Sequence, residues 1–206
     1  MFTISAEQRA KHIKLILFDV DGVLTDGSIW VFPLPDSDSD SPPDRNKSYT
    51  EPKGFSAHDG AGITLARLGG LKCGVITRRV SETVAIRARD LKMEHVYMGQ
   101  AFKMRAVREI LEKDSLTLEE IAYVGDDVID LPVMRLCGLA IAVANARERV
   151  KAAAHYVTPN SGGYGAGRDA IEFILSAKGT LDQAIEDYID EENPVNPTMD
   201  IGKGGA

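Results

Sequence analysis

The sequence predicts an α/β protein with a doubly wound parallel sheet. Its apolar runs are short and nearly continuous, as expected for strands that are covered on both faces. These runs alternate with helical patterns, which implies right-handed crossovers between parallel strands. The length of 206 residues suffices for one such core but not for a second sizeable domain. Six strands are expected, at residues 13–18, 73–76, 95–98, 121–124, 139–143 and 155–157.

Helical periodicity fills several of the intervals between these strands. Apolar stripes at helical spacing are formed by Val80, Val84, Ala88 and Leu91 and by Met104, Val107 and Leu111. Thr117 and Glu120 make a capping-box pattern, although a strand follows so soon that only about one helical turn fits there. Residues 181–189 are expected to form a last helix.

Two stretches depart from this alternation. The first is rich in proline, serine and aspartate and cannot supply a core, but its flanks at residues 28–32 and 49–55 are apolar enough to pair as a β-hairpin. We therefore expect a flap hairpin at about residues 28–57 with an acidic Ser/Asp/Pro-rich insert. The second is a C-terminal tail at residues 191–206, which leaves residues 1–190 as a single domain.

Composition excludes several kinds of partner. A formal net charge of −7 argues against nucleic acid, because a phosphate backbone is bound by clustered Lys and Arg. Cys73 and Cys137 are far apart in apolar surroundings, so we expect them to be reduced and buried. The first twelve residues lack a signal-peptide core, and no run approaches the roughly 18 apolar residues that span a bilayer. We expect a cytoplasmic protein without a membrane partner.

The most informative motif follows the first strand. Asp19 and Asp21 are spaced i, i+2 on an extended segment, so both carboxylates can point to one reaction centre, and Gly22 lets the backbone turn away sharply. One acid can attack a substrate while the other moves protons. Acidic residues and glycine also end strands for plain turn reasons, so the motif alone does not decide the function.

A second acidic cluster follows the strand at residues 121–124. It comprises Asp126, Asp127 and Asp130. Because the carboxyl ends of parallel strands share one edge of the sheet, this cluster should meet the first. Four or five carboxylates would repel one another there unless a hard cation held them, and oxygen ligands favour Mg²⁺. Asp130 could also serve as the N-terminal cap of a helix.

Two more polar residues follow strands in the same way. Thr77 ends the strand at residues 73–76, and Lys103 opens a helical pattern after the strand at residues 95–98. The order of paired aspartates, hydroxyl, lysine and second acidic cluster resembles the haloacid dehalogenase superfamily of phosphohydrolases. The resemblance covers roughly residues 13–190. It implies a magnesium-dependent phosphatase that works through an aspartyl-phosphate.

The resemblance also implies a role for each motif residue. Asp19 would be the nucleophile, and Asp21 would protonate the leaving group and then deprotonate the attacking water. Thr77 would donate a hydrogen bond to a phosphate oxygen, and Lys103 would complete the catalytic set. The side chains of Asp19 and Asp126 and the carbonyl of Asp21 would bind Mg²⁺. Asp127 and Asp130 would orient the water ligands and Lys103.

Further motifs resemble the small capless branch of that superfamily typified by the 3-deoxy-D-manno-octulosonate 8-phosphate (KDO 8-phosphate) phosphatases. They are residues 59–63, the Gly99-Gln100 pair before Lys103, and residues 162–166 before Arg168. This resemblance implies a hairpin flap in place of a large cap and a homo-oligomer, expected to be a tetramer. It also implies a phosphorylated 2-keto-3-deoxy sugar acid as substrate, with KDO 8-phosphate as the first candidate.

Six residues are candidates for substrate binding: Arg79, Arg78, His58, Asp59, Gly163 and Arg168. Arg79 matches the octulosonate pattern and suits a substrate with a carboxylate. His58 departs from it, since an arginine is expected there, and Arg78 replaces a glycine. The glycine-rich segment could present amides to an anion or simply start a helix. Arg168 could instead pair with Asp169 or Glu172.

Two other functions stay open at this point. One is a nononate 9-phosphate phosphatase or a phosphatase of broad sugar-phosphate range. The other is a regulatory or partner-binding module that uses the same scaffold without catalysis. A binding module has no need to keep both the nucleophile and the acid, so the full set of motif residues favours an enzyme.

Overall fold

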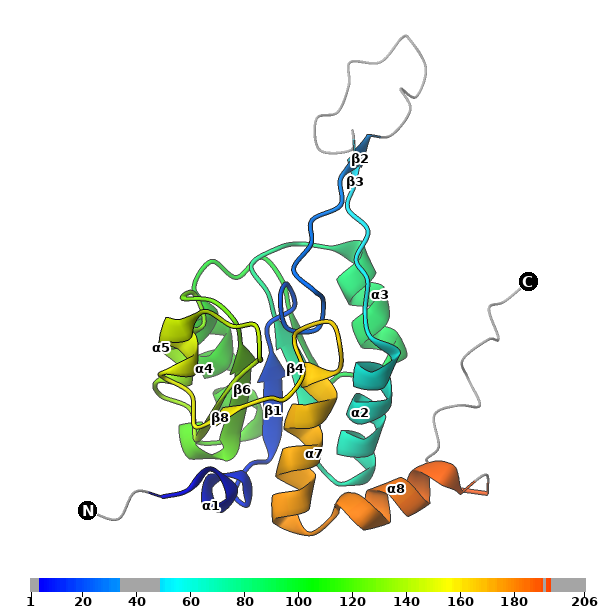
Figure 1. The fold of residues 1–206 in the computed structure, drawn as a ribbon, viewed down its shortest axis with the longest axis vertical. Helices are drawn as coiled ribbons and strands as arrows, with labels where there is room; N and C mark the ends of the chain where they lie inside the picture. The colour runs from blue at the N-terminus through cyan, green and yellow to red at the C-terminus, as the bar shows by residue number, and fades with distance from the viewer. Residues whose placement is uncertain (1–3, 34–48, 191, 194–206) are drawn as a thin grey trace.

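The computed structural model describes residues 4–33, 49–190 and 192–193. Its centre is a six-stranded parallel sheet in the order β5–β4–β1–β6–β7–β8 (Figure 1). The strands are β1 (Leu15–Phe18), β4 (Lys72–Ile76), β5 (His95–Tyr97), β6 (Ile121–Gly125), β7 (Leu139–Ala142) and β8 (Tyr156–Val157). All six predicted strands are present, with ends that differ by at most two residues from those expected.

Strand order places a topological switch at the middle of the sheet. From β1 the chain moves to β4 and β5 on one side and then crosses to β6, β7 and β8 on the other. Every residue of β1 and β6 is buried, as expected for central strands that are covered on both faces. In sheets of this kind, ligands bind in the crevice at the carboxyl ends of the strands beside the switch.

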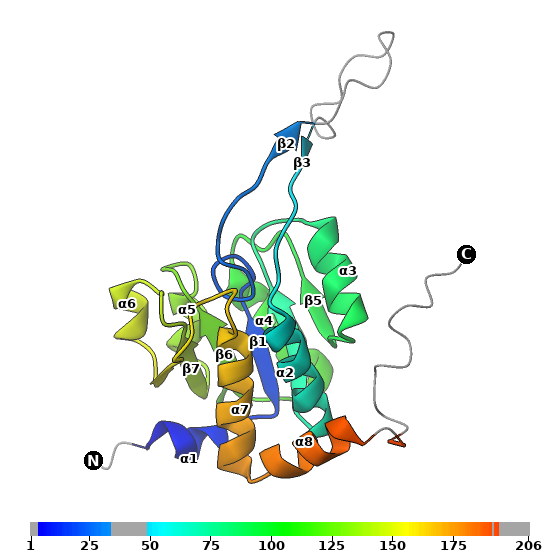
Figure 2. The same ribbon diagram turned by 45° about the vertical axis from the view of Figure 1, so that its right-hand side comes forward.

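Helices cover both faces of the sheet (Figures 1 and 2). One layer contains α2 (Ala57–Leu68), α3 (Glu82–Asp90) and α7 (Ala166–Lys178), and the other contains α4 (Lys103–Asp114), α5 (Leu131–Met134) and α6 (Glu148–Lys151). The short α1 (Ala6–Ala10) and the final α8 (Leu181–Ile189) lie at the amino ends of the strands. None of the described helices has the length and apolar character needed to cross a membrane.

The predicted helical segments are present, with a difference at Val80. The stripe on α3 is correct for Val84 and Ala88, which are buried, whereas Val80 precedes the helix and is exposed. The capping box of Thr117 and Glu120 is present and starts a three-residue 3₁₀ helix, η1 (Leu118–Glu120). Residues 181–189 form α8 as predicted.

Helix α2 was not predicted, because two glycines interrupt its pattern. Ser56 caps it by accepting a hydrogen bond from the His58 amide. A Cβ atom at Gly62 would lie 2.9 Å from Cα of Arg168, so this position must be glycine for α2 and α7 to pack side by side.

The flap is present as a two-stranded arm. Antiparallel β2 (Phe32–Pro33) and β3 (Tyr49–Thr50) pair over two residues each, which is a shorter ladder than the predicted flanks allow. Residues 34–48, which include the predicted acidic insert, lie outside the described residues, as does nearly all of the predicted tail. Both views show the arm rising from the end of the sheet where the strands finish (Figures 1 and 2).

Candidate active site

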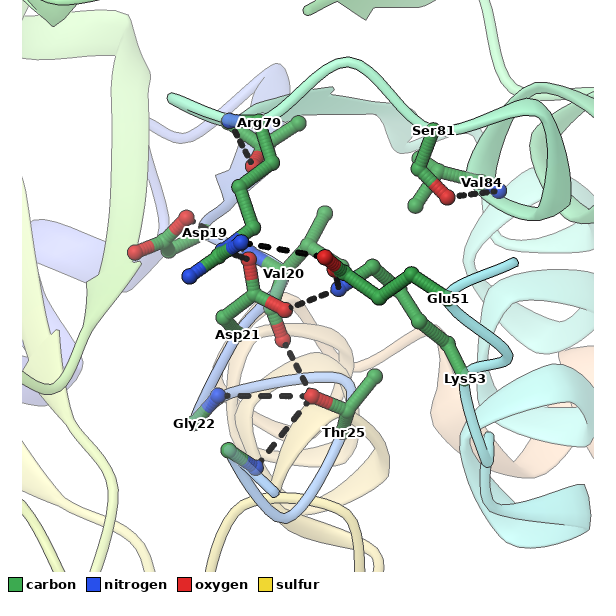
Figure 3. A network of polar contacts seen from close by, with 12 residues as sticks. Asp19, Val20, Asp21, Gly22, Thr25, Glu51, Lys53, Arg79, Ser81 and Val84 are labelled. Carbon is green, nitrogen blue, oxygen red and sulfur yellow. Dashed lines mark hydrogen bonds and ion pairs between the residues drawn. The ribbon is translucent and has the colours of Figure 1, made fainter. Parts of the chain in front are cut away.

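The loop after β1 is fixed by its own hydrogen bonds. Asp19 is buried at the end of the strand, and its Oδ1 accepts a hydrogen bond from the Val20 amide at 2.7 Å. The hydroxyl of Thr25 donates to the Val20 carbonyl and accepts from the amides of Gly22 and Gly27. The loop therefore holds the nucleophile candidate on a rigid turn (Figure 3).

Gly22 is required at its position for two reasons. Its φ of +88° lies in the left-handed region, and a Cβ atom there would lie 2.2 Å from Oδ2 of Asp126. The absence of a side chain thus lets the carboxylate that follows β6 approach the loop that follows β1. The two acidic clusters meet at the switch point, as predicted from the shared sheet edge.

Asp19, Asp126 and Asp130 each place a carboxylate oxygen within 4.8 Å of the other two. Asp126 Oδ1 is buried and has no hydrogen-bond partner among the described residues. An orphaned buried carboxylate oxygen is costly unless a cation compensates it. The donors are all oxygens, as Mg²⁺ prefers, so the residues present fit that ion.

The pKa values of two carboxyl groups in this cluster are raised. Burial raises the pKa of Asp19 to about 6, and the nearby Asp130 adds to the shift while Lys103 opposes it. Burial also raises the pKa of Asp126 to about 7, with Asp130, Asp19 and Asp127 contributing. Both directions mean that the protein without metal resists placing two more negative charges here.

Asp130 supports the other site residues rather than capping a helix. It is fully buried; Oδ1 accepts hydrogen bonds from Lys103 Nζ and from the Tyr123 hydroxyl, and Oδ2 accepts from the amides of Asp126 and Asp127. It precedes α5, but its side chain makes no capping bond. With four contacts, Asp130 orients groups around the site, and Asp19 and Asp126 remain the better metal ligands.

Lys103 is the cation of the buried cluster. Its Nζ lies 2.7 Å from Asp19 Oδ2 and 2.7 Å from Asp130 Oδ1. The side chain is almost fully buried, at the first residue of α4. Tyr123, which lies below it on β6, was not predicted as a site residue, because a tyrosine in an apolar strand looks like ordinary core.

A small cavity of about 180 Å³ opens over these residues. It is lined by Asp19, Asp21, Thr77, Arg78, Arg79, Asp126, Asp127 and Ile129. Thr77 is buried and its Oγ1 accepts a hydrogen bond from the Arg79 amide, which leaves the hydroxyl hydrogen available to a ligand. Asp127 is exposed and accepts a hydrogen bond from the Val128 amide. The cavity gathers the predicted catalytic side chains except Lys103, which lies beneath them.

The flap adds two charged residues that the sequence did not point to. Lys53 Nζ lies 2.5 Å from Asp21 Oδ1 and 3.0 Å from Glu51 Oε1 (Figure 3). Glu51 Oε2 accepts a hydrogen bond from Arg79 Nη1 at 3.1 Å, and Arg79 Nε lies 3.7 Å from Asp21 Oδ2. Burial alone would lower the pKa of Lys53, but its contacts with Asp21 and Glu51 outweigh this and raise it.

Two of the other predicted substrate-binding residues, Asp59 and Arg168, make contacts within and between α2 and α7. Asp59 is buried, and its Oδ1 accepts a hydrogen bond from the Arg168 amide near the start of α7. The Arg168 side chain pairs with Glu172 at 2.6 Å, which is one of the two pairings expected as its alternative role. His58 is exposed in the first turn of α2.

The glycine-rich segment packs against the loop that follows β1. The amide of Gly163 donates to the Val23 carbonyl at 3.0 Å, and that of Gly162 donates to Asn145 Oδ1. These two amides are therefore already used and do not face an anion. Gly165 precedes the first residue of α7, so the segment starts a helix, which is the second of its two expected roles.

Comparisons with known proteins agree with this geometry. A family model of haloacid dehalogenase-like hydrolases matches residues 76–165. The 3-deoxy-D-manno-octulosonate 8-phosphate phosphatase KdsC of Escherichia coli (strain K12) is 39% identical over 176 residues, which cover 85% of this chain and 86% of the relative. The crystal structure of the corresponding phosphatase from Yersinia pestis has 37% identity and a TM-score of 0.77 over 86% of this chain and 88% of that one.

A third similar protein was solved with ligands. The KDO 8-phosphate phosphatase of Moraxella catarrhalis, in complex with a magnesium ion, a phosphate ion and a KDO molecule, is 36% identical with a TM-score of 0.77 over 88% of this chain and 96% of that one. The carboxylate oxygens of Asp19, Asp126 and Asp130 described above fit the same kind of ion. The chain belongs to the haloacid dehalogenase-like hydrolases, and within them to the capless phosphoric monoester hydrolases that resemble the KDO 8-phosphate phosphatases.

Proposed function

We propose that this protein is a magnesium-dependent phosphomonoesterase that hydrolyses a phosphorylated 2-keto-3-deoxy sugar acid. KDO 8-phosphate is the first candidate for this substrate. The observation that carries the proposal is the cavity in which Asp19, Asp21, Thr77 and Asp126 converge above Lys103. The names of the relatives support the choice of substrate.

The proposed reaction has two steps. A carboxylate oxygen of Asp19 attacks phosphorus, and the bond from phosphorus to the sugar oxygen breaks. The sugar oxygen keeps the electron pair of that bond and receives a proton from Asp21. Water then attacks phosphorus and gives a proton to Asp21, while the electron pair of the phosphorus–Asp19 bond returns to the carboxylate. The aspartate pair is regenerated, and inorganic phosphate is released.

Other residues of the chain stabilise charge during both steps. Lys103 holds the attacking carboxylate in place at 2.7 Å and offsets its charge, and Thr77 donates its hydroxyl to a phosphoryl oxygen. Mg²⁺ would be held by the side chains of Asp19 and Asp126 and the carbonyl of Asp21, and it supplies positive charge for the phosphoryl oxygens.

We extend the proposal to self-association as a homo-oligomer, with a tetramer as the expected state. The flap exposes a row of large apolar side chains: Ile29, Trp30, Val31, Phe32 and Tyr49. Apolar patches of this kind mark interaction surfaces. Residues 1–190 act as one domain in this proposal, and contact between flaps of neighbouring subunits would cover the site.

A phosphate-release assay tests the substrate directly. The panel should contain KDO 8-phosphate, a nononate 9-phosphate, a hexose phosphate without a carboxylate and p-nitrophenyl phosphate, each with Mg²⁺ and with EDTA. We expect kcat/KM to be highest for KDO 8-phosphate and activity to require the metal. A higher value for the nononate or the hexose phosphate would contradict the substrate assignment, and metal-independent turnover would contradict the mechanism.

A further inference from the structure

We infer that Lys53 of the flap is a positioning residue for Asp21, one that fixes one carboxylate oxygen so that the other faces the leaving group. The inference rests on the proposed function, because it assigns a role within the same phosphatase reaction. It extends that function by making residues 51–53, the stem of the flap, part of the catalytic machinery.

The contact between Lys53 and Asp21 joins segments that are 32 residues apart in the sequence. Nζ of Lys53 lies 2.5 Å from Asp21 Oδ1, within the reach of a charge-assisted hydrogen bond. The lysine side chain is only 2% exposed, whereas that of Asp21 is 24% exposed. A flexible surface lysine would not be held in this way, so the contact belongs to the built site.

Glu51 completes the arrangement from the same stem. Its Oε1 lies 3.0 Å from Lys53 Nζ and its Oε2 lies 3.1 Å from Arg79 Nη1, so one carboxylate ties the lysine to the segment that follows β4 (Figure 3). A buried ammonium group needs such paired acceptors. Lys53 is therefore oriented from one side by Glu51 and presents its remaining hydrogens to Asp21.

The two oxygens of Asp21 are treated differently by these neighbours. Oδ1 takes the short bond from Lys53, whereas Oδ2 has Arg79 Nε at 3.7 Å, which is longer than a hydrogen bond. Asp21 also lines the catalytic cavity. Oδ2 is thus the oxygen that can give a proton to the leaving oxygen and take one from water, and Lys53 fixes the rotamer that aims it.

A purely structural lysine would anchor the flap without affecting proton transfer, and leaving-group dependence separates the two roles. A sugar alkoxide needs the proton from Asp21 as its bond to phosphorus breaks, whereas p-nitrophenolate leaves readily without one. Loss of the Asp21 geometry should therefore impair alkyl phosphates selectively in kcat/KM, which reports steps up to formation of the aspartyl-phosphate.

The experiment compares Lys53→Met, Lys53→Gln and Lys53→Arg with the wild type on KDO 8-phosphate and on p-nitrophenyl phosphate. Lys72→Met is the matched control, because it removes an exposed lysine that pairs with Asp114 at the opposite end of the sheet. For Lys53→Met we expect kcat/KM to fall about 100-fold on the sugar phosphate, the lower end for general acid–base catalysis, and less than about tenfold on the aryl phosphate. Lys53→Arg should restore part of the loss, and the control should change neither value.

Equal losses on both substrates, or no loss on the sugar phosphate, would overturn the inference. If circular dichroism shows that Lys53→Met does not fold, Lys53→Gln decides. Its amide is polar but uncharged and one bond shorter than the ammonium group, so it does not reproduce the contact with Asp21 Oδ1 and should show the same selective loss. If the wild type prefers another alkyl phosphate, that substrate replaces KDO 8-phosphate, and only the substrate assignment has failed. A wild type that hydrolyses no phosphomonoester would overturn the proposed function and this inference together.

Discussion

The edge of the central sheet and the stem of the flap contribute to the same cavity by different physical means. At the edge, Asp19 and Asp126 follow buried parallel strands, and the fold itself fixes their separation. In the flap, β2 and β3 pair over only two residues each and are exposed, so the backbone supplies little rigidity. The flap is tied to the site by side-chain charges at Glu51 and Lys53. In the proposed reaction the sheet edge therefore supplies the reacting groups, and the flap orients one of them, Asp21, through Lys53.

The largest effect should come from the rigid region. Asp19→Asn removes the proposed nucleophile but keeps the size of the side chain, so we expect activity to fall by about 10⁴-fold or more. Folding should survive, because an uncharged amide avoids the cost of burying a carboxylate, which is the main cause of the raised pKa of Asp19. Phosphate release and thermal melting measure the two quantities. Near-normal activity in this variant would refute Asp19 as nucleophile.

Metal removal should have the next largest effect, and that effect should depend on pH. The pKa values of Asp19 and Asp126 are raised to about 6 and about 7 in the metal-free fold, above the ordinary value of 3.8. The folded state therefore holds protons that the unfolded chain has already lost, and metal-free stability should fall as pH rises from about 4 to about 7.

Mg²⁺ should reverse this loss, because it neutralises both carboxylates. At about 100 times its Kd, a ligand stabilises by about 2.7 kcal/mol, or roughly 5–10 °C in Tm for a chain of this length. Melting curves with EDTA or Mg²⁺ should show a larger gain near pH 8 than near pH 5. A gain that is independent of pH would show that the two carboxylates do not bind the metal.

Arg79 allows a finer test of the connection between the two regions. It contacts Glu51 of the flap and lines the cavity, so Arg79→Gln should raise KM about tenfold for a substrate with a carboxylate, the size expected for one charged hydrogen bond. KM for a sugar phosphate without a carboxylate should change by less than about threefold. Arg78→Gln, which removes a cation from the same cavity, is the matched comparison. Equal changes in KM for both substrates would show that Arg79 does not bind the carboxylate.

The smallest effect on the stability of a subunit is expected at the arm. Trp30 and Phe32 are exposed, so replacing both by serine should change Tm of the isolated subunit by no more than about 2 °C, while light scattering should show a smaller assembly. Ile189→Ser, which removes an exposed apolar side chain from α8, should leave the assembly intact. If the variant of Trp30 and Phe32 forms an assembly with the molecular mass of the wild type, the arm does not contribute to the interface.

Sequence reasoning succeeded where chain position determines spatial position. The residues after parallel strands had to meet at one edge, so the strand pattern alone was enough to place Asp19, Thr77 and Asp126 together. Helix α2 was missed because glycines that its packing requires weaken the helical pattern. Lys53 and Glu51 were missed because their roles depend on how the flap folds back, which no periodicity encodes. The structural roles of Asp59 and Gly163 likewise depend on contacts between distant segments.

In the proposed mechanism a phosphoryl group is transferred to Asp19. The most direct measurement is rapid acid quenching of Asp21→Asn with p-nitrophenyl phosphate, followed by mass spectrometry of the peptide that contains Asp19. This variant lacks the group that activates water, yet its substrate needs no proton to leave, so the intermediate should accumulate. We expect a burst of p-nitrophenol and one phosphoryl group on Asp19. Release of p-nitrophenol without a burst, and with no modified peptide, would contradict it.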